Sequence, residues 1–118
     1  MAIRAKAKPR PAGPVFDIHV FLATAVRKDG PEIEWTPGAR YSLLILNRQP
    51  EGEAPDEPLA RKSASAAGWT NIRLERSRRL PVTSVPEGEA MRAAFREAVT
   101  DGTSVVAYGR PLPVAARD

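Results

Sequence analysis

Cysteine is absent from the chain, and histidine occurs once, at His19. The absence of cysteine excludes disulfide bonds, thiol catalysis and metal sites built on thiolates. A single histidine excludes any metal site that needs two imidazole ligands. A chain without cysteine suits a reducing compartment, although it also suits an exported protein, and we expect a cytoplasmic location.

Long apolar runs and ligand-binding motifs are also missing. No stretch approaches the roughly 18 apolar residues of a membrane helix, so we expect no membrane partner. Residues 1–10 are positively charged, but no apolar core follows them, which argues against a secretory signal. The glycines form neither a phosphate loop nor a dinucleotide fingerprint, and no serine stands in a nucleophile elbow. The sequence therefore predicts no cofactor.

What the chain does contain is typical of one small folded domain. Its 118 residues are 42% hydrophobic and 27% charged, which fits a single globular unit with one core. The first 13 residues hold four basic side chains and no acid, and Pro9, Pro11 and Pro14 favour extended backbone there, so we expect a flexible basic arm. We expect one α+β domain over residues 14–110 and a C-terminal tail over 111–118.

Alternating and continuous apolar patterns predict the strands. In residues 15–26, one face is apolar apart from Thr24 and the other is mixed, as expected for a strand, and Asp29-Gly30 then gives a tight-turn signal. Residues 40–47 contain four consecutive aliphatic side chains, as expected for a central strand with two apolar faces. Further strands are expected at 69–80 and 103–108, with a short return strand at 32–35.

Two stretches predict helices. Asp56 is a candidate N-cap for a helix over about 57–67, and Gly68 is placed to end it. The second helix follows a capping-box match at 84–87 and ends at Asp101-Gly102. It has apolar side chains spaced at i, i+3, i+4, i+7 and i+8, at Met91, Ala94, Phe95, Ala98 and Val99.

The order of these elements predicts the fold class. We expect an α+β two-layer sandwich, with a four- to five-stranded, mostly antiparallel sheet and both helices packed on one face. The shared face rests on the right-handed crossing of strand–helix–strand units. Along residues 69–80, strict alternation would put Ile72, Leu74 and Leu80 on one face together with Arg76 and Arg78.

The face of the sheet opposite the helices is the leading candidate for a binding surface. Apolar side chains on an uncovered sheet face usually pack against a second subunit or another protein. We therefore expect a small non-enzymatic domain that acts through a protein partner or as a homodimer, of an inhibitor, immunity or adaptor type. Covering by the same chain is the alternative. The interface residues predicted in this way are Phe21, Leu44, Leu46, Asp17 and His19.

Nucleic-acid binding is the alternative function. The net charge is +4 with a pI near 10.0, and much of the positive charge lies in the arm and in one predicted strand. Such a set could follow a phosphate backbone, although single-strand binders usually add aromatic side chains for stacking. The residues concerned are Arg73, Arg76, Arg78 and Arg79, with Lys62 from the preceding helix.

Catalysis and metal binding are less favoured. Asp17 and His19 share one strand face, and an aspartate can orient an imidazole as a general base. No nucleophile or substrate anchor accompanies them, so a small enzyme is the third hypothesis and no catalytic residue is assigned. The acidic residues between 51 and 57 lack the ligand spacing of a calcium loop and predict a solvated loop rather than a metal site.

Overall fold

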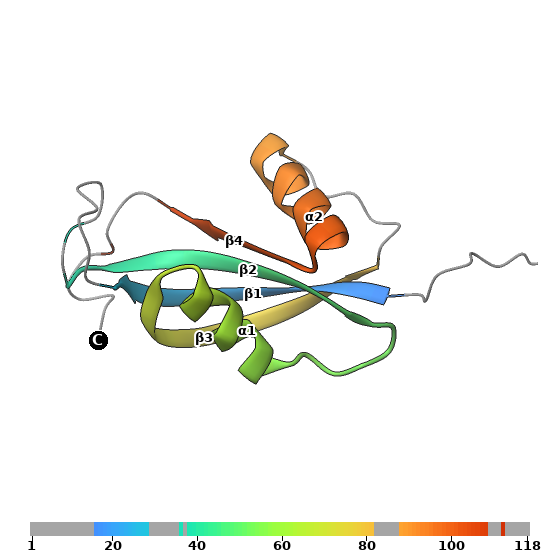
Figure 1. The fold of residues 1–118 in the computed structure, drawn as a ribbon, viewed down its shortest axis with the longest axis horizontal. Helices are drawn as coiled ribbons and strands as arrows, with labels where there is room; N and C mark the ends of the chain where they lie inside the picture. Colours follow the sequence, from blue (N-terminus) through green and yellow to red (C-terminus); the bar gives the residue numbers. More distant parts are fainter. Residues whose placement is uncertain (1–15, 29–35, 37, 82–87, 109–111, 113–118) are drawn as a thin grey trace, which may run out of the picture.

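The computed structural model describes residues 16–28, 36, 38–81, 88–108 and 112. The predicted arm, the return strand at 32–35, the capping box at 84–87 and nearly all of the tail lie outside these residues. The described elements are, in chain order, β1 (Phe16–Arg27), β2 (Arg40–Pro50), α1 (Glu57–Ala66), β3 (Trp69–Pro81), α2 (Glu89–Asp101) and β4 (Thr103–Ala107) (Figure 1).

The four strands form one antiparallel sheet in the order β3-β1-β2-β4. The long β1 lies inside it and pairs with β2 on one side and β3 on the other. The run of four aliphatic residues does fall on an inner strand, β2, as predicted. Of the two edge strands, β3 has 13 residues and β4 has only 5.

The register between β1 and β2 separates the core into two clusters. Phe21 lies opposite Ile45, whereas Val20 lies opposite Leu46 on the other face. One cluster packs under α1 and consists of Phe21, Ala23, Ala25, Ala39, Tyr41, Leu43, Ile45, Ala60, Ala64 and Trp69. The other packs under α2 and consists of Ile18, Val20, Leu46, Ala94, Phe95 and Ala98. We call these two sides of the sheet the α1 face and the α2 face.

An α+β domain with a four-stranded antiparallel sheet and two helices packed against it is therefore confirmed. The expectation that both helices share one face is wrong, because each helix packs on a different apolar cluster. The handedness rule applies to connections between parallel strands. It covers the passage from β2 to β3 through α1, but β3 and β4 run in opposite directions, so α2 is not bound by it.

Local sequence explains where α1 begins and ends. The Asp56 carboxylate accepts a hydrogen bond from the Leu59 amide at 3.0 Å, which is the predicted N-cap. At the other end Gly68 has a φ of 101°, a conformation that favours glycine, and the helix stops before it. Arg27 and Lys28 from the end of β1 donate to the Ala67 and Ser65 carbonyls, which satisfies the C-terminal turn.

Alanine side chains allow α1 to lie close to the sheet. Ala60 and Ala64 are fully buried, one turn apart on the same side of the helix. We expect Ala64→Leu to lower the free energy of unfolding by roughly 1–3 kcal/mol, because the larger side chain would force α1 away from the sheet. Ala66→Leu, at an exposed position of the same helix, is the matched control and should change stability by less than about 0.5 kcal/mol in urea denaturation. Equal losses in both variants would contradict this packing.

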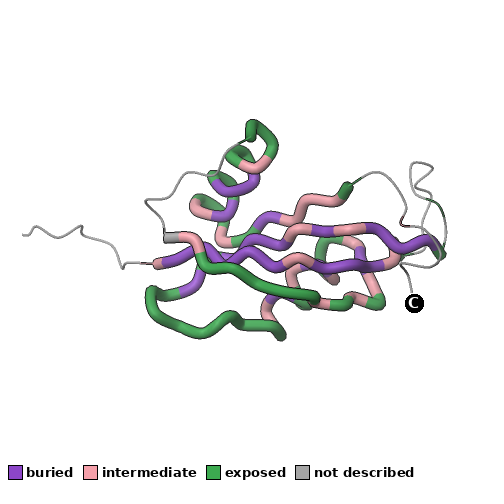
Figure 2. Tube along the Cα trace, turned by 180° about the vertical axis from the view of Figure 1, so that it is seen from behind, coloured by how far each residue is buried: buried purple, intermediate pink, exposed green. Residues whose placement is uncertain are grey.

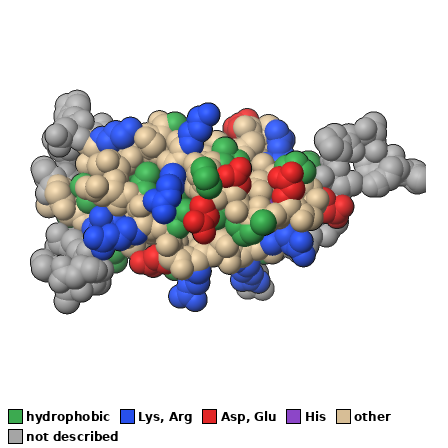
Figure 3. All heavy atoms as spheres, turned by 90° about the horizontal axis from the view of Figure 1, so that it is seen from below, with side chains coloured by type: hydrophobic (Ala, Val, Ile, Leu, Met, Phe, Trp, Pro, Cys, Tyr) green, Lys and Arg blue, Asp and Glu red, His purple; other side chains and the backbone are tan. Residues whose placement is uncertain are grey.

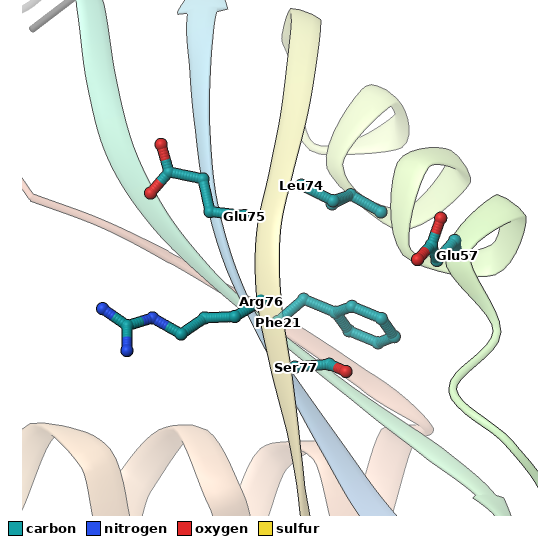
Figure 4. A pocket seen from close by; sticks show the side chains of 6 residues that line it. All are labelled: Phe21, Glu57, Leu74, Glu75, Arg76 and Ser77. Atoms are coloured by element: carbon teal, nitrogen blue, oxygen red, sulfur yellow. The ribbon is translucent and has the colours of Figure 1, made fainter.

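The alternation of side chains between the two faces of the sheet is interrupted in β3 at Glu75. Leu74 lies opposite Ala23 and Arg76 lies opposite Leu22, so β3 has one residue more than β1 over this interval. Figure 4 shows the result: Leu74 points toward α1, whereas Glu75 and Arg76 both point to the other side. The predicted single face for β3 is therefore wrong. Ile72 and Leu74 pack on the α1 cluster, whereas Leu80 packs on the α2 cluster.

Candidate binding surface

Most of the residues predicted for a partner interface are buried in the domain. Phe21 is 1% exposed under α1 and Leu46 is fully buried under α2, while Leu44 is half-buried on the α2 face. Because Leu44 lies opposite Leu22 and not opposite Phe21, the five residues do not share a face. The premise of one uncovered face shared by these residues is wrong. The prediction of a protein partner was drawn from that face, so it needs a different surface.

Asp17 and His19 lie at one end of the α1 face and are almost inaccessible to solvent. The Asp17 carboxylate accepts a hydrogen bond from the Gly52 amide at 3.2 Å and lies 3.9 Å from an Arg79 guanidinium nitrogen. Within the described part of the chain, neither ring nitrogen of His19 has a hydrogen-bond partner. The hydrogen bond that would let Asp17 orient an imidazole base is thus not formed between them.

Burial sets the protonation behaviour of His19. It lowers the pKa of the imidazole below the ordinary value of 6.5, and the positive charge of Arg79 acts in the same direction. The Asp17 carboxylate and Glu53 oppose the shift, which remains downward. A buried, neutral imidazole without contact to solvent is better suited to a structural position than to proton transfer with a substrate.

Asn47 lies opposite His19 and connects three elements. Its side-chain oxygen accepts hydrogen bonds from Ser63 of α1 at 3.0 Å and from Thr103 of β4 at 2.6 Å. Its amide nitrogen, like the His19 ring, has no partner among the described residues. Two residues further on, the buried Gln49 side chain bonds to Ala54 and Asp56 and so positions the acidic loop. The sequence interpretation missed these polar residues, although they continue the alternation of β2 beyond Ile45.

We expect Asn47→Ala to lower the free energy of unfolding by roughly 1–3 kcal/mol, because Asn47 is fully buried and its side-chain oxygen is the acceptor shared by the Ser63 and Thr103 hydroxyls. Thermal or urea denaturation measures the loss. The triple variant Asn47→Leu, Ser63→Ala, Thr103→Val removes donors and acceptor together and should recover much of it. If the triple variant is less stable than both the natural protein and Asn47→Ala, then the hydrogen bonds of Asn47 to Ser63 and Thr103 are not the source of its stabilising effect.

Arg40 is a further buried polar residue and lies near the opposite end of the sheet. Its guanidinium donates to the Thr24 hydroxyl at 3.1 Å and to the Asn71 carbonyl at 2.7 Å, across β1. Burial lowers the pKa of Arg40, and the nearby Arg73 adds to this while Glu75 opposes it. These contacts join the beginnings of β2 and β3, where Asn71 has a positive φ of 51°. The hydrogen bonds to the Thr24 hydroxyl and the Asn71 carbonyl explain why an arginine can be buried at this position.

The residues predicted for nucleic-acid contact are exposed. Arg76 and Arg78 lie on the α2 face, opposite Leu22 and Val20, whereas Arg79 lies on the α1 face and pairs with Asp17. Figure 2 shows a long exposed stretch along β3, in contrast to the buried inner strands. In Figure 3, acidic and basic side chains are interspersed on the side of the molecule where α1 and β3 lie. The arginines are thus accessible but do not form one basic groove. Those exposed in β3 are Arg73, Arg76, Arg78 and Arg79, and Lys62 is exposed on α1.

The outer edge of β3 is the longer of the two edges of the described sheet, and most of its residues are exposed. Both faces carry a helix, and on the opposite edge the short β4 is followed by bonds from the Tyr108 and Leu112 amides to β2. At β3, Arg61 of α1 bonds to the Ile72 carbonyl at 2.7 Å, near the beginning of the strand. The part of β3 after Ile72 therefore offers the longest edge to an incoming chain.

In the ranges that the structure covers, no group of three or more His, Asp or Glu side chains is placed to hold a metal ion. Neither described helix has the length and hydropathy needed to span a membrane. Comparisons of the chain with family models, with curated proteins and with solved structures gave no match.

Proposed function

We propose that this chain is a small non-enzymatic domain that binds another protein through the outer edge of β3. The observation that carries the proposal is a 13-residue strand at the edge of a sheet whose two faces are both packed against helices. Unpaired peptide groups on such an edge can accept a further strand. Inhibitor, immunity and adaptor roles belong to this class, and a cytoplasmic location is part of the proposal.

The buried polar residues support binding over catalysis. His19 is fully buried, Asp17 is nearly so, and no described hydrogen bond joins them. A general base must reach its substrate, directly or through a water molecule. The four arginines of β3 are exposed instead, and for this reason contact with a partner is the favoured function.

Nucleic-acid binding is the second candidate, favoured by the exposure of the β3 arginines. Two features weaken it. The arginines are divided between the two sides of the strand, and Trp69 is only 2% exposed, so its ring offers no stacking face. Trp35 lies outside the described residues.

Photo-crosslinking at single positions in the cells that encode the protein tests the proposal. A photoreactive side chain at Ser77, exposed on β3, should give a discrete protein adduct, whereas one at Ala93, exposed on α2, should not. The adduct should disappear when Arg76 and Arg78 are both changed to glutamate. Adducts at Ala93 alone, or adducts at Ser77 that contain nucleic acid in place of protein, would contradict the proposal.

A further inference from the structure

We infer that the partner segment is an extended strand in which acidic side chains alternate with small aliphatic ones. This inference rests on the proposed function, since it names the chemistry of the partner at the same edge. Beyond the irregularity at Glu75, a strand added to β3 would place successive side chains alternately on the α2 face and the α1 face. The two sides of β3 offer different surroundings to those side chains.

On the α2 face, the surroundings are basic. Arg76 and Arg78 lie opposite Leu22 and Val20 of β1, and both are exposed. Arg73, opposite Thr24, lies on the same face, and Glu75 points to the same side as Arg76, so this face carries three arginines against one glutamate. Opposite charges directly across two strands stabilise their pairing, and like charges weaken it. The side chains of the partner that lie on this face should therefore be acidic.

On the α1 face, a small hollow lies between β3 and the beginning of α1. It has a volume of about 70 Å³ and is lined by side chains that include Phe21, Leu74, Ser77 and Glu57. Figure 4 shows Phe21, Leu74 and Ser77 directed to this side of β3, toward Glu57 of α1. The two apolar side chains suit a small aliphatic group, and the Glu57 carboxylate disfavours an acidic one. A partner strand should therefore carry acidic side chains on the α2 face and small aliphatic side chains on the α1 face.

A second copy of the chain fits this edge poorly. Pairing of β3 with itself would bring two strongly basic strands together, and like charges across strands are destabilising. A polyanion without peptide groups would match the arginines but would leave the edge amides and carbonyls of β3 without a strand partner. An acidic strand would match the positive charge of β3 and also pair with its edge amides and carbonyls, so it is the partner that we propose.

A synthetic acetylated and amidated peptide of alternating glutamate and valine, seven residues long, is the probe for this inference. Titrated into ¹⁵N-labelled protein, it should shift the amide signals of residues 73–80 and leave those of α2 nearly unchanged. Replacing Arg76 and Arg78 by glutamate should weaken binding about tenfold or more. The matched control, Arg92→Glu with Arg96→Glu on the exposed side of α2, should weaken it less than about threefold.

Two further ligands separate strand addition from charge attraction. The same peptide with every backbone nitrogen methylated keeps its charge but has no residue N–H donor on either edge, and it should fail to bind. A single-stranded oligonucleotide of equal charge should bind at least about tenfold more weakly than the unmodified peptide. Equal binding of either ligand overturns the inference, as does self-association of the protein that shifts the same β3 amides.

The outcomes also distinguish this inference from the function on which it rests. If Ser77 is crosslinked to a protein but the acidic peptide does not bind at β3, the partner chemistry is wrong and edge binding stands. If Ser77 gives no protein adduct and the peptide does not bind, both are wrong. Binding of the peptide together with a protein adduct at Ser77 supports both.

Discussion

Phe21→Ala is expected to lower the free energy of unfolding by roughly 3–5 kcal/mol. The ring is 1% exposed and packs between β1 and α1, so its removal would leave a cavity that the small alanines of α1 cannot fill. An aromatic side chain on an open sheet face would lose far less. Urea denaturation followed by circular dichroism measures the difference directly.

Tyr108→Ala is the control for Phe21→Ala, because Tyr108 is an aromatic residue that is 49% exposed. We expect the free energy of unfolding of this variant to change by less than about 0.5 kcal/mol. A cost for Phe21→Ala as small as that of the control would mean that α1 does not cover the ring and that the sheet has an open face there.

Mild acid is expected to destabilise the protein through His19. Because burial lowers the pKa of His19 in the folded state, the unfolded chain binds a proton more readily. The stabilisation is therefore fully present above pH 6.5 and is lost as the pH falls toward the lowered folded pKa. The free energy of unfolding should fall by at most about 1.4 kcal/mol per pH unit in this range. Asp17, Glu53 and Arg79 are the charged groups that act on the ring.

Denaturation between pH 7.5 and 5.5 measures this effect, with His19→Leu as the comparison. Leucine has a similar size and no proton to bind, so the slope with pH should become much smaller in the variant. The variant should also be at least as stable as the natural protein at pH 7.5, since it removes ring nitrogens that have no described partner. An unchanged slope in His19→Leu would assign the pH dependence to other groups. His19 is the only histidine, so its NMR signals report its own titration.

The elements of the fold could be predicted from the sequence where one local pattern decides the structure. The α2 pattern from Met91 to Val99 and the Asp56 cap of α1 depend on neighbours within a few residues, and the described structure has both. The inner position of β2 also followed, because four consecutive aliphatic residues need two apolar faces. In each case the information lies within one element.

The candidate site depended on relations between elements, which the sequence leaves open. Alternation within each strand does not tell whether Phe21 and Leu44 lie on the same face of the sheet. The register between β1 and β2 determines this: Phe21 lies opposite Ile45, so Phe21 and Leu44 lie on different faces. The additional residue at Glu75 has no mark in the sequence, yet it moves Arg76 and Arg78 away from Leu74. The predicted interface was therefore assembled from residues that belong to separate cores.

Amide hydrogen exchange of the free domain, and of its complex with the protein captured at Ser77, tests the central claim most directly. Edge amides of β3 that lack a strand partner should exchange readily in the free domain. Edge binding predicts that exchange slows over residues 73–80 in the complex, with little change in α2. Slower exchange confined to α2 or to the far edge at β4, with β3 unchanged, would contradict the claim that β3 is the contact surface.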